Sequence, residues 1–204
     1  MSELKLNNKR TILVGLAFLS ICSFWQMYDN LVPLILKGTF GLDESLTGMI
    51  MAADNILALF LLPFFGGLSD RTNTKLGRRT PYILAGTAGA GVLMNLLPML
   101  DNSYFKQAAP FKLVSFVIVL GLLLIAMGTY RSPAVALMPD VTPKPLRSKG
   151  NAIINLMGAV GGVLYLGVSV LLYPREKTQG LVHVDYQPLF FVVSLIMVVS
   201  VAAL

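Results

Sequence analysis

The stretch from Leu113 to Met138 reads LVSFVIVLGLLLIAMGTYRSPAVALM and contains one charged residue, Arg131. It is longer than the roughly 20 apolar residues that a helix needs to cross the hydrocarbon core of a bilayer. Its apolar residues follow one another without the strict alternation of a barrel strand. A helix satisfies its own backbone hydrogen bonds inside lipid, so this stretch predicts a membrane-spanning helix.

Five more apolar runs of similar character flank this stretch. We expect six helices, at roughly 11–36, 46–68, 81–100, 113–138, 151–173 and 188–204. A chain that is 55% hydrophobic and only 13% charged cannot bury all of this apolar surface in a soluble fold. The sequence therefore predicts an all-α transmembrane protein, with residues 1–204 forming a single six-helix bundle in contact with the lipid bilayer.

The basic residues report the orientation of this bundle. The net charge of +6 comes from Lys and Arg in short loops, which indicates membrane topology rather than a nucleic-acid partner. Most of the 16 basic residues lie on the side that holds the N-terminus, and cytoplasmic loops are the ones enriched in Lys and Arg. We expect a multi-pass protein of the cell (inner) membrane with a cytoplasmic N-terminus. Because the last apolar run reaches Leu204 without a basic flank, we also expect it to be half of a longer protein.

Residues suited to catalysis are few. The chain has one cysteine, Cys22, and one histidine, His183, so it can form neither an intrachain disulfide nor a site with two histidine ligands. It contains no HExxH, G-x-S-x-G or P-loop motif. We expect no enzymatic activity, no metal and no cofactor.

Three ionisable residues lie inside apolar runs: Asp29, Asp54 and Arg131. Each costs about 2.5–3.5 kcal/mol to insert at mid-membrane, so the expectation is that they face a cavity. With a rise of about 1.5 Å per residue, Asp29 and Asp54 share a level in the outer half and Arg131 lies toward the inner half. Two carboxylates at one cavity suit proton uptake and release, which predicts proton coupling through Asp54 and Asp29. The alternatives are carboxylates that reach water at helix ends and an arginine that snorkels.

An aromatic face adjoins one of these carboxylates. Trp25, Tyr28 and Asp29 are spaced i, i+3 and i+4, so they share one side of a helix. Aromatic rings stack on the apolar faces of a sugar while carboxylates accept hydrogen bonds from its hydroxyls. We predict a substrate site formed by Trp25, Tyr28, Arg131 and Asn55; ordinary core packing is the alternative for Trp25.

The segment that follows the second apolar run carries a motif. From Gly66 to Tyr82 it reads GGLSDRTNTKLGRRTPY. This resembles the G-x-x-x-D-R…G-R-R signature between helices 2 and 3 of the major facilitator superfamily, in the longer form seen in the sucrose-transporter and glycoside–cation symporter branch. A second match reads ALMPDVT from Ala136 to Thr142, with Arg147 downstream. The resemblance covers essentially the whole chain and implies the N-terminal six-helix half of such a transporter.

The resemblance also implies a charged latch at the cytoplasmic mouth. In the family this latch engages a helix of the C-terminal half and holds the outward-open state. The matching residues here are Asp70, Arg71, Gly77, Arg78, Arg79, Asp140 and Arg147. A loop that only sets topology would account for the arginines but not for Asp70 or the glycines.

Two departures from the family narrow the expected function. Plant sucrose carriers have an arginine where this chain has Val135, and the nearest arginine is Arg131, one turn earlier. The paired helix-2 carboxylates of sodium-coupled melibiose carriers are reduced here to Asp54, which favours a proton over a sodium ion. We therefore expect sugar:proton symport by alternating access, with a second six-helix half as partner.

Two alternatives stay open at this stage. The chain could be a truncated, non-transporting half or a membrane interaction subunit. It could also belong to a multidrug efflux carrier, because its ten methionines suit a plastic apolar cavity.

Overall fold

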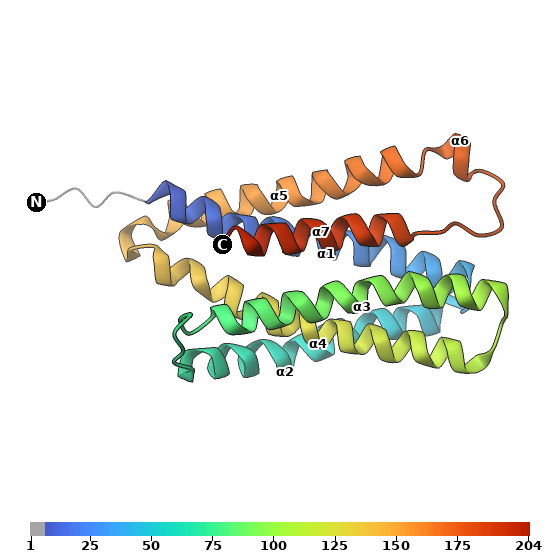
Figure 1. Cartoon of the computed structure of the whole chain (residues 1–204), viewed down its shortest axis with the longest axis horizontal. Helices are drawn as coiled ribbons and strands as arrows, with labels where there is room; N and C mark the ends of the chain where they lie inside the picture. Colours follow the sequence, from blue (N-terminus) through green and yellow to red (C-terminus); the bar gives the residue numbers. More distant parts are fainter. Residues whose placement is uncertain (1–6) are drawn as a thin grey trace, which may run out of the picture.

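The structure, a computed structural model, describes residues 7–204 as a bundle of long antiparallel helices (Figure 1). The six long helices are α1 (Asn8–Gly38), α2 (Glu44–Arg71), α3 (Thr80–Lys106), α4 (Pro110–Val141), α5 (Arg147–Leu172) and α7 (Gln187–Ala202). A short 3-10 turn, η1 (Lys144–Leu146), precedes α5, and the four-residue helix α6 (Arg175–Thr178) follows it. The predicted all-α, six-helix fold is confirmed.

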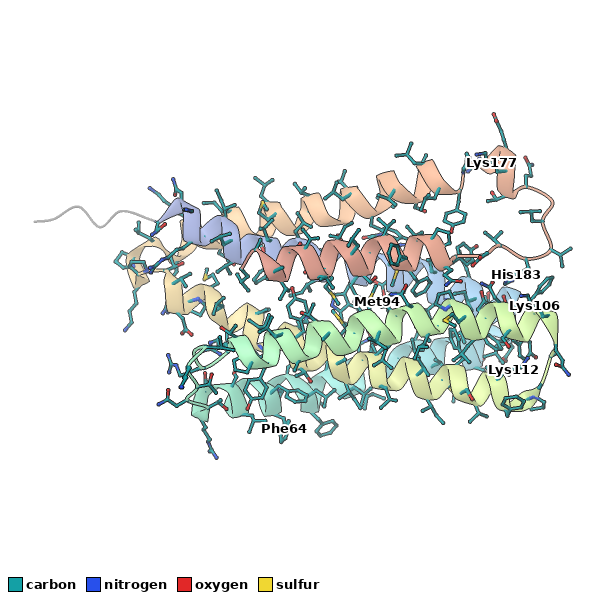
Figure 2. The ribbon with its side chains drawn as sticks, in the orientation of Figure 1. Phe64, Met94, Lys106, Lys112, Lys177 and His183 are labelled. Atoms are coloured by element: carbon teal, nitrogen blue, oxygen red, sulfur yellow. The ribbon has the colours of Figure 1, made fainter. Side chains whose placement is uncertain are left out.

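The surface of the bundle is suited to lipid. Helices α1 to α5 are each long and apolar enough to cross a membrane, and α7 is a shorter apolar helix of 16 residues. Large apolar side chains such as Leu59, Phe64 and Val170 project from the outer faces of the helices; Figure 2 shows Phe64 pointing away from the bundle. Exposed apolar surface on this scale is stable in hydrocarbon rather than in water. The chain is a multi-pass membrane protein.

The bundle has two ends, which differ in their polar residues. One end holds the α2–α3 connection, the turn η1 and the C-terminus; the other holds the α1–α2, α3–α4 and α5–α7 connections (Figure 1). We call them the Arg79 end and the His183 end, after the residues that organise them. Helix α3 joins the two, and it ends at Lys106 rather than at Leu100. It continues through the polar residues Asp101 and Asn102 because their side chains find their partners in the α5–α7 loop.

Small residues allow close contact between α1 and α5. A Cβ atom on Gly161 would lie 2.0 Å from the carbonyl oxygen of Leu19, and one on Gly158 would lie 2.9 Å from the Sγ of Cys22. The Ser23 hydroxyl donates to the Gly161 carbonyl across the same seam at 2.8 Å. Small residues such as glycine let two helix backbones approach closely in a membrane. Here it seals α1 against α5 within one bundle.

Helix α4 is joined to the core by a buried hydroxyl pair. The Tyr130 ring is fully buried, and its hydroxyl lies 2.6 Å from the Oγ of Ser20 and donates to the Ala17 carbonyl at 3.0 Å. On the other side of α4, a Cβ on Gly86 would lie 2.6 Å from the Tyr130 backbone nitrogen. Helices α1, α3 and α4 are thus held in register near mid-bundle, where the candidate site lies.

Candidate functional site

A small pocket near the middle of the bundle collects residues from three helices. Trp25 of α1, Asp54 of α2 and Arg131 of α4 line it together with aliphatic side chains such as Leu57 and Leu124. Its volume is about 20 Å³, room for no more than one water. The structure therefore brings together one residue predicted for proton coupling and two predicted for substrate binding.

Arg131 and Trp25 are in direct contact. The guanidinium carbon of Arg131 lies 5.3 Å from the centroid of the Trp25 ring. At this distance the negative face of the indole attracts the cation, and the attraction is stronger where water is excluded. The arrangement places a fixed positive charge against an aromatic surface in the middle of the bundle.

Two polar atoms in this region have no protein partner. The Nε1 of Trp25 and the hydroxyl of Tyr28 are buried, and neither forms a hydrogen bond within residues 7–204. The two rings meet edge to face, with centroids 5.4 Å apart, and Tyr28 is fully buried. Leaving a buried donor unpaired is unfavourable, and both groups keep an unused capacity for hydrogen bonding.

The carboxylates of α1 and α2 occupy different surroundings. The Oδ1 of Asp54 accepts hydrogen bonds from the backbone nitrogen and the side-chain Nδ2 of Asn55, at 2.5 and 2.8 Å. Asn55 is exposed, and its side-chain amide is hydrogen-bonded to Asp54 rather than directed into the pocket lining. Its place in the substrate site stays a prediction. Asp29 is exposed on the surface of the bundle and lies close enough to Asp54 for the two charges to interact. In the described part of the chain, no ion pair links Asp54 to Arg131.

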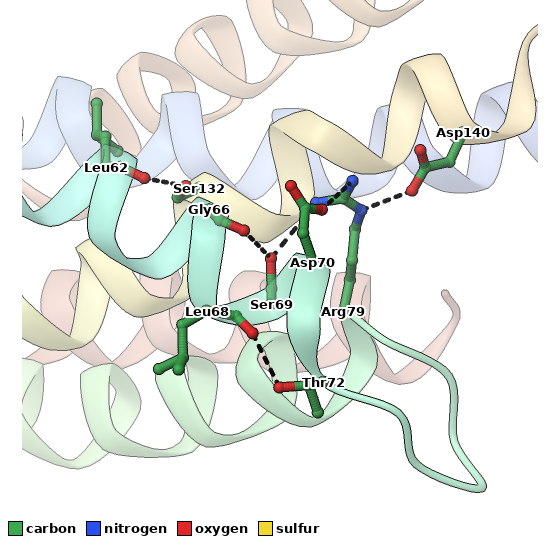
Figure 3. A network of polar contacts seen from close by, with 9 residues as sticks. All are labelled: Leu62, Gly66, Leu68, Ser69, Asp70, Thr72, Arg79, Ser132 and Asp140. Atoms are coloured by element: carbon green, nitrogen blue, oxygen red, sulfur yellow. Dashed lines mark hydrogen bonds and ion pairs between the residues drawn. The ribbon is translucent and has the colours of Figure 1, made fainter.

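The predicted latch at the Arg79 end centres on a single arginine. The guanidinium of Arg79 contacts the Oδ1 of Asp70 at 2.9 Å through NH2 and the Oδ2 of Asp140 at 2.6 Å through Nε. It also donates from NH1 to the Ser69 hydroxyl at 3.4 Å. Figure 3 shows the Arg79 side chain between the two carboxylates. We call these four residues the Arg79 cluster; they join the ends of α2 and α4 to the start of α3.

Position along the chain explains why Arg79 rather than its neighbour takes this role. Arg79 is the residue directly before the first turn of α3, and its side chain is 9% exposed. Gly77 has a φ of +95°, a left-handed conformation that side chains disfavour, and it turns the loop back toward α3. Arg71 and Arg78 remain exposed and form no ion pair among the residues described here.

The last predicted latch residue lies beyond this cluster. An NH2 group of Arg147, at the start of α5, donates to the Pro139 carbonyl at 3.3 Å. Arg147 thus bridges α5 to the end of α4 without contacting Asp70 or Arg79.

The sequence prediction missed two groups of residues. Ser69 is buried and belongs to the Arg79 cluster. It lies in the S-D-R motif, but it is uncharged, and the predicted latch was built from charged residues and a glycine. At the opposite end, His183 lies against a buried Asp101, whereas the sequence placed His183 only in a polar loop. A signal existed, because Asp101 and Asn102 directly follow an apolar run.

The sequence profile of the Major Facilitator Superfamily matches residues 13–204. Sucrose transport protein SUC3 of Arabidopsis thaliana is 29% identical over 152 residues, which are 69% of this chain and 25% of that protein. Sucrose transport protein SUT1 of Oryza sativa subsp. japonica is 27% identical over 168 residues, 76% of this chain and 31% of that protein.

An animal protein is also similar. Solute carrier family 45 member 3 of Mus musculus is 24% identical over 175 residues, 84% of this chain and 31% of that protein. The chain thus spans about a quarter to a third of the length of these relatives. The family profile covers nearly the whole chain and accords with the helical bundle and the loop between α2 and α3. This chain belongs to the Major Facilitator Superfamily.

Proposed function

We propose that this chain forms one half of a secondary transporter that carries a sugar together with a proton. The observation that carries the proposal is the convergence of Trp25, Asp54 and Arg131 on one pocket. Similarity to sucrose transport proteins of two plants supports a sugar as the substrate. Transport then proceeds by alternating access, with the substrate bound between this half and a second six-helix half.

Polar and aromatic residues in and beside the pocket have distinct roles in this proposal. The Trp25 ring offers a stacking surface, and its free Nε1 together with the free Tyr28 hydroxyl provides hydrogen bonds to sugar hydroxyls. Arg131 donates up to five hydrogen bonds in a planar fork, two of which suit neighbouring hydroxyls. Asn55 orients the Asp54 carboxylate through its two hydrogen bonds.

Asp54 and Asp29 carry the proton in this mechanism. When both are ionised, their charges repel; taking up one proton removes the repulsion and permits closure around the substrate. The Arg79 cluster lies at the end of the bundle that is richer in Lys and Arg, which is the expected cytoplasmic side of the inner membrane. It holds α2, α3 and α4 together while the opposite side of the carrier opens.

Substrate binding can be tested through the single tryptophan. Because Trp25 is the only Trp in the chain, its fluorescence in detergent micelles reports on the pocket alone. We expect sucrose or a related disaccharide to quench this signal saturably, with mannitol at equal osmolarity as the control. Arg131→Lys keeps the charge but loses the planar fork, so it should weaken sugar binding about tenfold or more. Unaltered binding by this variant would exclude Arg131 from the substrate site.

Coupling is tested in the twelve-helix carrier that the proposal requires, reconstituted into proteoliposomes. An inward pH gradient should drive uptake of labelled sugar, and a sodium gradient in a parallel experiment should not. Asp54→Asn should abolish gradient-driven accumulation while leaving sugar exchange at equilibrium. Accumulation by the Asp54→Asn carrier that follows the same pH profile as the unmodified carrier would rule out the coupling role.

A carrier for amphipathic drugs is the second candidate. The observation in its favour is a pocket of about 340 Å³ between α2 and α4, lined almost entirely by aliphatic side chains such as Met49, Ile50 and Leu120. Uptake of a lipophilic cation that sucrose does not inhibit would favour this second function over sugar transport.

A further inference from the structure

Asp101 is a buried carboxylate that the proposed mechanism does not use. It lies in the last turns of α3, at the His183 end, and its exposed fraction is 0%. The Thr39 hydroxyl lies beside the carboxylate, but neither carboxylate oxygen has a hydrogen bond of good geometry with any residue between 7 and 204. A buried ionised carboxylate without donors is strongly unfavourable, so Asp101 requires either a proton or a neighbouring cation.

The basic group beside Asp101 is the imidazole of His183, which the α5–α7 loop delivers. Its Nε2 lies 3.8 Å from the Oδ2 of Asp101. The ring stacks on Phe105, with centroids 4.3 Å apart and planes 12° apart. Figure 2 shows His183 at the same end of the bundle as Lys106, the last residue of α3. Two elements distant in the sequence thus meet through one carboxylate and one imidazole.

The hydrogen bonds of the ring allow it to gain or lose a proton in place. Asn102 donates from Nδ2 to the Oδ1 of Asp185 at 2.7 Å, so its own Oδ1 faces His183 Nε2, at 2.8 Å, as an acceptor. Nε2 therefore carries a hydrogen. On the other side, Nδ1 lies 3.3 Å from the hydroxyl of Thr39, which donates to a neutral ring and accepts from a protonated one. We call Thr39, Asp101, Asn102 and His183 the His183 cluster.

The surrounding charged groups have partners or positions of their own. Asp185 also accepts a hydrogen bond from the Gln187 backbone nitrogen. Lys106 lines an open pocket at this end of the bundle, together with His183 and Asp185. On the neighbouring helices, Lys112 of α4 donates to two carbonyls and Lys37 of α1 pairs with Glu44.

Two phenols also adjoin the cluster. The Tyr173 hydroxyl donates to the Asp185 carbonyl at 2.8 Å. Burial raises the pKa of Tyr173 to about 12, and burial followed by the charge of Asp101 raises the pKa of Tyr186. Neither phenol loses its proton between pH 5 and 8, so neither competes with Asp101 and His183 for a proton in that range.

We propose that Asp101 and His183 form a proton-binding site that fastens the α5–α7 loop onto α1 and α3. With one proton the pair is neutral overall, either as carboxyl and imidazole or as carboxylate and imidazolium. Without that proton, Asp101 is a buried charge with no counter-charge. The loop is therefore held at low pH and released as the pH rises.

Protons reach the site through an open pocket beside it. This pocket has a volume of about 550 Å³ and is lined by Asn102, Lys106, His183 and Asp185 among others. The site shares no residue with the pocket of Trp25, Asp54 and Arg131, so it is independent of the proposed coupling carboxylates. Its ligand is the proton alone, taken from the water at the His183 end.

The first test uses the single histidine. Because His183 is the only His in the chain, ¹⁵N-histidine labelling with a histidine-free purification tag gives one ring to follow by NMR in detergent micelles. Asp101→Asn should move the midpoint of this titration to lower pH by about 1 unit or more, since an opposite charge within about 4–6 Å has that effect. Glu44→Gln, a carboxylate lost from the same end of the bundle, is the matched control and should leave the midpoint in place. Equal midpoints for the unmodified chain and Asp101→Asn would overturn the proposal.

The second test follows the loop itself. In a Cys22→Ser background, a spin label at Val182→Cys reports on a position that is 89% exposed. The label should gain mobility as the pH rises from 5 to 8, and both Asp101→Asn and His183→Gln should abolish that dependence. Two independent variants guard against misfolding of either one. Label mobility that stays pH-dependent in both variants, or is pH-independent in the unmodified loop, would refute the fastening role. Neither test measures sugar transport, so their outcomes do not depend on whether the proposed function is correct.

Discussion

Helix α3 begins and ends beside buried ionisable groups, and its two ends treat them differently. At its start, the guanidinium of Arg79 forms ion pairs with the carboxylates of Asp70 and Asp140. At its other end, Asp101 faces His183, and histidine is the residue type that most readily gains or loses a proton near neutral pH. A buried charge with a permanent partner makes a permanent tie between helices. One with a titratable partner makes a tie that solution conditions can undo.

Removing the ion pairs at the Arg79 end should have the largest effect. Arg79→Ala leaves Asp140 and Asp70 without their cation, and we expect it to lower the free energy of unfolding by roughly 3 kcal/mol. Unfolding by SDS in mixed micelles measures this quantity. Arg78→Ala is the matched control, because the neighbouring arginine is exposed and its loss should change stability very little. Equal losses for the two variants would mean that the loop, rather than the ion pairs, stabilises this end.

The two carboxylates of the Arg79 cluster should contribute differently to the free energy of unfolding. Asp140→Asn weakens the 2.6 Å contact with Nε and should lower the free energy of unfolding by about 2 kcal/mol. Asp70 has a side chain that is 58% exposed, so Asp70→Asn should lower it by less than about 1 kcal/mol. The same SDS titrations, run side by side, give the order of the two effects. A larger loss for Asp70→Asn would reverse our assignment of the stronger partner.

At the other end, the size of the effect should depend on pH. Asp101→Asn removes a buried carboxylate that is unpaired once the shared proton has left, so at pH 8 we expect it to stabilise the fold by about 1 kcal/mol. At pH 5 the proton is bound in the unmodified chain, and the gain should disappear. Thermal unfolding at both pH values measures the difference. A gain of equal size at the two pH values would show that the substitution acts through packing instead.

The smallest expected effect concerns the hydroxyl that contacts the imidazole. Thr39→Val keeps the shape of the side chain but removes the contact with His183 Nδ1 at 3.3 Å, and it should lower the free energy of unfolding by roughly 0.5 kcal/mol. Thr129→Val is the matched control, because the Thr129 hydroxyl donates to the carbonyl one turn earlier in α4 and not to another helix within residues 7–204. Indistinguishable effects would mean that Thr39 contributes nothing specific to the His183 cluster.

The fold could be read from the sequence because hydrocarbon imposes a simple rule. A run such as Leu113–Met138 must be a helix in lipid, and six such runs give six helices. The contacts within the site could not be predicted from such a rule, because they depend on the path of the backbone. Arg78 and Arg79 are identical residues side by side, and only the backbone path through Gly77 into the first turn of α3 determines which of them is buried.

The His183 cluster could not be assembled from the sequence for a related reason. Asp101 and His183 belong to different connections, and their meeting depends on how the α5–α7 loop folds back over α3. Depth estimates also separated Asp54 from Arg131, since they count residues along each helix. The side chains of both nevertheless line one pocket beside Trp25, because long side chains reach along the bundle axis.

The glycine seam between α1 and α5 has a consequence for how the protein is made. Helix α1 leaves the ribosome well before α5, so the groove beside Leu19 that only Gly161 fits is empty while α2, α3 and α4 are synthesised and inserted. During that interval lipid, the insertion machinery or a chaperone must cover this face of α1. Completion of α5 is therefore the step at which α1 first gains its neighbour across this seam.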